Sequence, residues 1–303
     1  MAVAAVEKTV YAIGGASGAG DQQVVSTAEA LTLPARKTQP AAQWRSLPDA
    51  KSPRLMMAWT VQGDKIWLIS GLYNGTVLTT VESFDPRSGV WETGPPLPVP
   101  LHHAAAATYR NEVVVLGGAS DNIADASNKV FALRGGNWVE LPSLTHPRAA
   151  PAAAVVGDKL VVVGGQNAKQ LVTQTEVFDG TSWKDAAKMP TPREHLAAVS
   201  DGTFMYTVGG RFLSADKNSA AFERYDPQAD TWTKLVDMPT PRGSYGATFI
   251  DGRVVAVGGE EPTQVLATVE AYDIADGKWS TLPPMPTARH GEAVATVGHT
   301  VYV

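Results

Sequence analysis

The sequence contains no cysteine among its 303 residues. A disulfide framework, a thiolate metal site, an iron–sulfur cluster and a cysteine nucleophile are therefore excluded. Clusters of lysine and arginine are also lacking, and the formal net charge is −5, so we expect no nucleic-acid partner. No stretch approaches the roughly 20 apolar residues of a membrane span. Glu7 and Lys8 interrupt the apolar start of the chain, which makes it a poor signal peptide.

One pattern recurs along the whole chain. An apolar run ends in two glycines, with serine replacing the first glycine in one copy, and the copies lie 45 to 56 residues apart. A polar stretch, a short run with Tyr or Phe, a tryptophan and a proline-rich segment follow each pair. The pairs are Gly14-Gly15, Ser70-Gly71, Gly117-Gly118, Gly164-Gly165, Gly209-Gly210 and Gly258-Gly259, and the tryptophans are Trp44, Trp91, Trp138, Trp183, Trp232 and Trp279. A period of about fifty residues is that of a propeller blade.

Glycine pairs followed by a separated Tyr and Trp, as in Gly209-Gly210, Tyr225 and Trp232, resemble the kelch repeat. The resemblance covers essentially all of the chain. Because kelch repeats form β-propellers, it implies an all-β fold, a six-bladed β-propeller of four-stranded antiparallel blades in a single domain over residues 1–303. Small side chains, as in Ala104–Thr108, fit innermost strands that converge on a narrow axis.

The two ends of the sequence carry duplicate copies of the innermost strand. Residues 2–15 match a first and a second strand, and residues 291–303 match another first strand and most of a second. Because an open edge strand is a liability, we expect residues 290–303 to complete the blade begun at the N-terminus. The sequence does not decide which duplicate occupies that blade. It stops where a glycine pair is due, which suggests a fragment of a longer protein.

Arginine and glutamate recur together in five of the six copies. The arginine ends the proline-rich segment, and the glutamate stands two residues before the aromatic of the third strand. The third copy has Leu101 and Lys129 in their places. Joint loss indicates two side chains that meet, because a buried charge left alone is costly. We therefore predict an Arg–Glu pair within a blade, formed by Arg54, Arg148, Arg193, Arg242 and Arg289 with Glu29, Glu82, Glu176, Glu223 and Glu270. The recurring aromatics are interpreted as packing between blades.

Two sets of connections vary between copies and should emerge on the same face of a propeller, namely the loops after the glycine pairs and the starts of the innermost strands. In kelch proteins that bind ligands these positions line a pocket around the central channel. The resemblance therefore implies candidate ligand- or partner-binding residues at Tyr73, Asn74, His102, His103, Asn167, Glu194, His195, Arg211, Phe212, Ser244, Tyr245, Glu260, Glu261 and His290, with Met56, Ser120, Asp121 and Gln166 at equivalent positions. A solvated rim of loops without a ligand is the alternative interpretation.

No catalytic residue, cofactor or metal site is predicted. No HExxH pair is present, and the adjacent His102 and His103 should point to opposite faces of a strand. Without cysteine, the Tyr–Cys copper chemistry of galactose oxidase is excluded, and the iron-binding Glu-x-x-x-Asp-x-x-x-His pattern of nitrile-specifier proteins is absent.

We expect a non-enzymatic recognition module that binds a protein segment, or a small ligand such as a carbohydrate, on the loop-rich face. Two alternatives stay open. One is an extracytoplasmic sensor domain of a bacterial membrane receptor or kinase, and the other is a carbohydrate mutarotase or epimerase, since bacterial sialic acid mutarotases are also kelch propellers. The compartment is therefore either cytoplasmic or, for a receptor fragment, extracytoplasmic.

Overall fold

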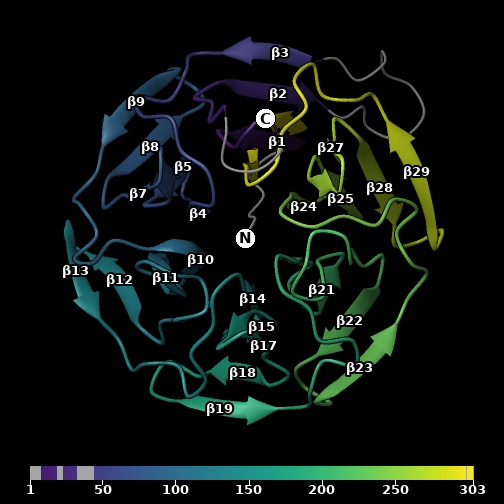
Figure 1. Ribbon diagram of the computed structural model, residues 1–303. Coiled ribbons are helices and arrows are strands. Elements are labelled where there is room, and N and C mark those ends of the chain that lie inside the picture. Colours follow the sequence, from purple (N-terminus) through teal and green to yellow (C-terminus); the bar gives the residue numbers. More distant parts are fainter. Residues whose placement is uncertain (1–7, 19–22, 33–43, 298, 303) are drawn as a thin grey trace.

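The computed structural model describes residues 8–18, 23–32, 44–297 and 299–302. Every helix or strand assigned in these residues is a β-strand, and the sheets lie around a central axis like the blades of a propeller (Figure 1). Hydrophobic clusters lie between neighbouring sheets, as where Leu116 and Ala153 share one cluster. The core is thus distributed around the ring instead of being concentrated at its centre.

Five sheets are four-stranded antiparallel blades. In each blade the chain runs from the axis outwards, and the tryptophan-bearing strand lies at the rim (Figure 1). The blades are β4 (Ala58–Gln62), β5 (Lys65–Ile69), β8 (Val81–Asp85), β9 (Val90–Thr93); β10 (His102–Tyr109), β11 (Glu112–Ala119), β12 (Val130–Arg134), β13 (Asn137–Glu140); β14 (Ala152–Val156), β15 (Lys159–Val163), β18 (Thr175–Phe178), β19 (Trp183–Ala186); β20 (Ala197–Ser200), β21 (Met205–Val208), β22 (Phe222–Asp226), β23 (Thr231–Lys234); and β24 (Gly246–Ile250), β25 (Arg253–Val257), β28 (Val269–Asp273), β29 (Lys278–Leu282).

The prediction of six four-stranded antiparallel blades is wrong, because among the described residues five sheets have this form. Besides these blades and three two-stranded hairpins, one sheet has five strands in the order β1-β30-β31-β2-β3 and joins the two end regions of the chain. Its strands are β1 (Lys8–Ile13), β2 (Ala28–Thr32), β3 (Trp44–Leu47), β30 (Ala293–Val297) and β31 (His299–Tyr302). Both β1 and β31 are copies of a second strand, and both pair with β30 and β2. They also pair in parallel with each other, so the duplicated strand adds a fifth member to this sheet.

The glycine pair lets the second strand end against the next blade. Gly117 has a φ of +67°, and a Cβ there would lie 2.5 Å from the carbonyl oxygen of Arg148, closer than real contacts allow. Ser70 replaces glycine at the one place where the neighbouring residue is Leu101 instead of arginine. Its hydroxyl accepts a hydrogen bond from the Leu101 N–H at 2.9 Å. Ser70 and Leu101, the two residues that depart from the repeat here, are therefore in direct contact.

The predicted Arg–Glu pairs are confirmed in all five copies. Arg148 Nη2 lies 2.5 Å from Glu176 Oε2, and both side chains are fully buried. Nη1 of the same arginine donates to the carbonyls of Gly164 and Gln174 at 3.0 and 3.1 Å. Each arginine thus joins its glutamate to neighbouring backbone. The pairs are Arg54–Glu82, Arg148–Glu176, Arg193–Glu223, Arg242–Glu270 and Arg289–Glu29.

The tryptophans join successive sheets, which confirms their predicted packing role. Each indole N–H donates to a backbone carbonyl of the segment that follows the preceding sheet, at 2.8 to 3.1 Å. The carbonyls belong to Pro283 for Trp44, Pro48 for Trp91, Pro95 for Trp138, Pro142 for Trp183, Ala187 for Trp232 and Val236 for Trp279.

Replacing Trp183 by phenylalanine should lower stability by about 1 kcal/mol through the lost indole hydrogen bond, in addition to the smaller ring. Trp67→Phe is the matched control, because Trp67 Nε1 is buried without a hydrogen-bond partner among the described residues. Thermal melts should show a fall of a few degrees for Trp183→Phe and a smaller one for Trp67→Phe. Equal falls would mean that the indole hydrogen bond contributes nothing to the contact between blades.

Candidate functional site

A closed ring of backbone hydrogen bonds surrounds the axis near the starts of the innermost strands. Each of its six residues donates its N–H to the carbonyl of the ring residue that precedes it in the chain, and the first donates to the last, at 2.7 to 3.1 Å. All six have positive φ, between 51° and 64°. In chain order they are Met56, His103, Ala150, His195, Ser244 and Gly291. Each residue lies at or just before the start of a different innermost strand, so the ring links the six innermost strands around the mouth of the axis.

Short hairpins follow three of the glycine pairs and stand beside this mouth. They are β6 (Leu72–Tyr73) with β7 (Thr76–Val77), β16 (Gln166–Asn167) with β17 (Gln170–Leu171), and β26 (Glu260–Glu261) with β27 (Gln264–Val265). Isolated bridges connect the residue after a glycine pair to the residue before the ring position, as in Glu194 with Arg211. The two loop positions singled out in the sequence are therefore direct neighbours.

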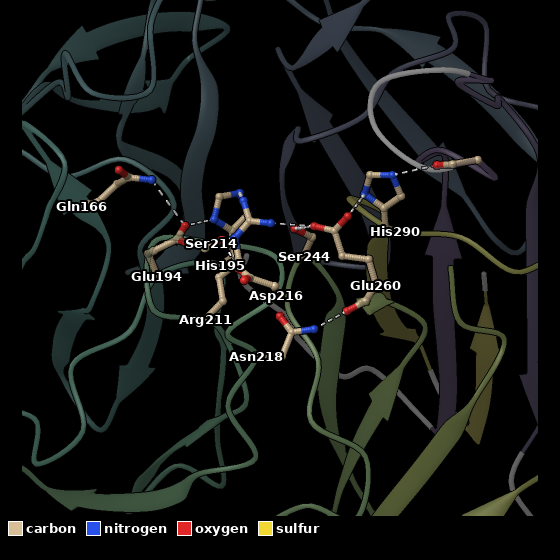
Figure 2. Close-up of polar contacts among 11 residues, drawn as sticks. Gln166, Glu194, His195, Arg211, Ser214, Asp216, Asn218, Ser244, Glu260 and His290 are labelled. Atoms are coloured by element: carbon tan, nitrogen blue, oxygen red, sulfur yellow. Dashed lines mark hydrogen bonds and ion pairs between the residues drawn. The ribbon is translucent and has the colours of Figure 1, made fainter. Parts of the chain in front are cut away.

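Two glutamates, one arginine and one histidine form a continuous polar network at the mouth (Figure 2). Arg211 Nε donates to Glu194 Oε1 at 2.8 Å, and Arg211 Nη1 donates to Glu260 Oε1 at 2.7 Å. Ser244 also donates to Glu260 Oε1, at 2.7 Å. The guanidinium thus joins two neighbouring blades whose carboxylates lie 66 residues apart in the sequence.

The protonation of His195 follows from its partners. Its Nδ1 contacts Glu194 Oε2, and its Nε2 lies 3.1 Å from Arg211 Nη2. A guanidinium only donates, so Nε2 must accept and the proton must lie on Nδ1. Burial, followed by the charge of Arg211, holds the pKa of His195 well below its usual value. His195 is therefore a neutral, fixed acceptor.

A second histidine, His103, lies against His195 with ring centroids 4.8 Å apart. Burial and the neighbouring His102 hold the pKa of His103 well below its usual value. His102 is itself buried, and its Nε2 lies 2.7 Å from the carbonyl of Asp121. On the other side of the network, His290 Nδ1 is 3.7 Å from Glu260 Oε2. Four histidines thus surround the mouth.

A pocket of about 400 Å³ opens beside this network. Arg211, Glu260, Glu261, Gln264, His103 and His290 supply its polar lining, and Met56, Ile123, Ala215, Pro262 and Val265 supply its apolar lining. A second space, of about 30 Å³, lies between His103, His195 and residues at the starts of the innermost strands. The larger pocket therefore offers the room for a ligand on this face.

The structure brings eight predicted residues to the network or pocket, namely His103, Glu194, His195, Arg211, Ser244, Glu260, Glu261 and His290. His102 lies directly behind them. The other five are elsewhere. Tyr73 and Asn74 form the exposed end of the β6–β7 hairpin, Asn167 lies in the β16–β17 hairpin, and Phe212 is exposed on the loop after Arg211.

Tyr245 departs most from the expected position on the binding face. Its side chain is fully buried in a core cluster, and its hydroxyl donates to the carbonyl of Val208. Burial raises its pKa. In this blade the ring residue is Ser244. The side chain of the next residue, Tyr245, packs against Gly209 in the glycine pair of the preceding blade. A Cβ on Gly209 would lie 2.6 Å from the Tyr245 hydroxyl.

Two residues at or near the mouth were missed in the sequence. Asn218 donates to the backbone carbonyl of Glu260 at 2.7 Å, and no repeat position marks it. Glu292 is fully buried one residue after the ring position Gly291. The other copies carry Met57, Ala104, Pro151, Leu196 and Tyr245 there, so comparison of the copies offered a signal for Glu292.

In the part of the chain that the structure describes, no group of three or more histidine, aspartate and glutamate side chains could hold a metal ion. Within the same residues, no helix has the length and apolar character needed to cross a membrane.

Comparison with known proteins decides the family. The family model described as the KLHDC2/KLHL20/DRC7 Kelch-repeats domain matches residues 102–303, and the Kelch motif matches residues 53–98. The chain belongs to the kelch-repeat family. Kelch-like protein terF of Aspergillus terreus is 27% identical over 293 residues, which cover 89% of this kelch chain and 54% of that protein. Kelch-like protein 7 of Rattus norvegicus is 38% identical over 96 residues, 32% of this chain and 15% of that protein.

This kelch chain therefore spans only part of the length of these relatives. Among solved structures, that of YjhT superposes with a TM-score of 0.73 at 16% identity, over 84% of this chain and 90% of that one. At this identity the likeness concerns the fold alone. It agrees with the propeller arrangement of the kelch chain in Figure 1.

Proposed function

We propose that this kelch propeller is a non-enzymatic recognition module that binds a segment of a partner protein at the mouth of its axis. The observation that carries the proposal is the pocket of about 400 Å³ built against the Glu194–Arg211–Glu260 network. Its polar groups are held by one another before any ligand arrives, and such preorganisation lowers the cost of binding.

Exposed apolar side chains on the loops that follow the glycine pairs favour a protein partner. Phe212 and Leu213 are 38% and 40% exposed, at the tip of the loop between the pocket residues Arg211 and Ala215. Tyr73 is 38% exposed on the β6–β7 hairpin. Aromatic anchors around a partly buried polar centre are typical of protein interfaces. Kelch-like relatives also favour protein partners, whereas nothing in the comparisons supports a carbohydrate ligand, a mutarotase or a sensor domain.

Site-specific photo-crosslinking tests the proposal. A benzophenone amino acid is placed at Phe212, at Tyr73 or, as a control of similar exposure, at Val139 on the outermost strand β13, which is 40% exposed. In extract from the native source, the same protein should be captured from positions 73 and 212 and not from position 139. Capture from all three positions alike, or none from 73 and 212, would contradict the proposed binding face.

A further inference from the structure

The mouth pocket carries more negative than positive charge. Glu260 and Glu261 line the pocket beside Arg211, whose three guanidinium nitrogens already have Glu194, Glu260 and His195 as partners. The neighbouring histidines His103 and His195 add no positive charge near neutral pH, because burial keeps them neutral. An incoming carboxylate would have to displace an existing partner of Arg211.

The glutamates, in contrast, keep acceptor positions for a cation. Glu260 Oε1 accepts from Arg211 and Ser244, whereas Glu260 Oε2 is 3.7 Å from His290 Nδ1, beyond hydrogen-bond distance. Glu261 Oε2 accepts from Gln264 Nε2 at 2.7 Å. A carboxylate has about four lone-pair sites. The pair of adjacent glutamates on β26 therefore offers acceptors at the edge of the pocket.

The rest of the pocket lining combines apolar side chains with His103, His290 and Gln264. Met56, Ile123 and Val265 contribute apolar lining from three different sheets or their loops. A cavity with two carboxylates at one place and aliphatic side chains elsewhere in its wall matches a side chain with an aliphatic stem and a cationic end. Lysine and arginine are the two side chains with this form.

We propose that the mouth pocket binds the side chain of a lysine or arginine presented by the partner segment. The cationic end lies beside Glu260 and Glu261, and the stem lies along Met56, Ile123 and Val265. Residues flanking the basic one contact Phe212 and Leu213 on the exposed loop. The inference rests on the proposed function and specifies the chemistry of the partner at that same site.

The test is selection of a random peptide library displayed on phage against the immobilised full chain. The expected result is enrichment of lysine or arginine at one fixed position. A selected peptide, synthesised with a fluorescent label, should bind at least tenfold more weakly by anisotropy when norleucine replaces that basic residue. Glu261→Gln in the protein should weaken binding about tenfold. Glu92→Gln, an exposed carboxylate on β9 at the rim, should leave it unchanged.

The outcomes separate this inference from the proposed function. Enriched peptides that lack a basic residue, or that carry an acidic one at the fixed position, overturn the inference and leave a peptide-binding module. Equal weakening by Glu261→Gln and Glu92→Gln also overturns it, because the effect would then come from overall charge. If the chain enriches no peptide at all, the proposed function fails, and the inference fails with it.

Discussion

Arg148→Leu is expected to destabilise the protein by about 3 to 5 kcal/mol, with a fall in melting temperature on the order of 10 °C. The substitution leaves the carboxylate of Glu176 buried without its cation. It also removes donors from the carbonyls of Gly164 and Gln174. The arginine is itself costly to bury, since desolvation lowers its pKa while Glu176 opposes the shift. Each of the two charged side chains is therefore tolerated in the interior only while its partner is present.

A double-mutant cycle measures this dependence. Arg148→Leu with Glu176→Leu should cost less than the sum of the two single substitutions, because the double variant buries no uncompensated charge. Arg134→Leu is the control, since Arg134 pairs with Glu112 at the surface with half of its side chain exposed. It should change stability by no more than about 0.5 kcal/mol. A loss for Arg148→Leu as small as that for Arg134→Leu would show that the buried pairs do not hold the blades.

Glu292→Gln is expected to flatten the dependence of stability on pH. Glu292 occupies a slot that is apolar in most of the other copies, and its Oε2 has no hydrogen-bond partner among the described residues. Burial raises the pKa of this carboxyl from 4.5 to about 8. The folded protein therefore keeps a proton on Glu292 at neutral pH, whereas the unfolded chain releases it.

This difference in protonation between the folded and the unfolded state decides how stability changes with pH. Below pH about 4.5 the carboxyl is protonated in both states, and its contribution to stability is fully present. As pH rises towards 8 only the unfolded state ionises, so stability falls by up to about 1.4 kcal/mol per pH unit. Melting temperatures from pH 5 to pH 8 should fall more steeply for the wild type than for Glu292→Gln. Glu140→Gln, a substitution of an exposed carboxylate on β13, should keep the wild-type slope. Parallel curves for all three proteins would refute the buried neutral carboxyl.

Repetition decided how much of this structure could be predicted. Six spaced copies indicated the propeller, and the joint replacement of arginine and glutamate by Leu101 and Lys129 was enough to predict five ion pairs. In the structure Leu101 is buried, and Lys129 pairs instead with Glu140 at the surface. Comparison of the copies within one sequence therefore detects contacts that recur in most of them.

Features that break the repeat could not be read in the same way. The resemblance to kelch proteins placed Tyr245 on the binding face by its position at the start of an innermost strand, but its side chain is buried, and Ser244 just before it has a positive φ. The fifth strand of the terminal sheet arises because both copies of the second strand, β1 and β31, pair with β30 and β2. The link between Glu194 and Glu260 through Arg211 crosses two blades and leaves no periodic trace in the sequence.

In the terminal sheet, non-covalent contacts between the two end regions of the chain close the ring. Near the axis β30 pairs with β1, farther out Arg289 binds Glu29, and at the rim Trp44 donates to the carbonyl of Pro283. The last two contacts are of the kinds that recur around the ring, where the chain itself runs on from sheet to sheet. The contacts that close the ring therefore act at three different distances from the axis. Opening the ring requires contacts at all three distances to separate, so the loss of either side-chain contact should leave the ring closed but less stable.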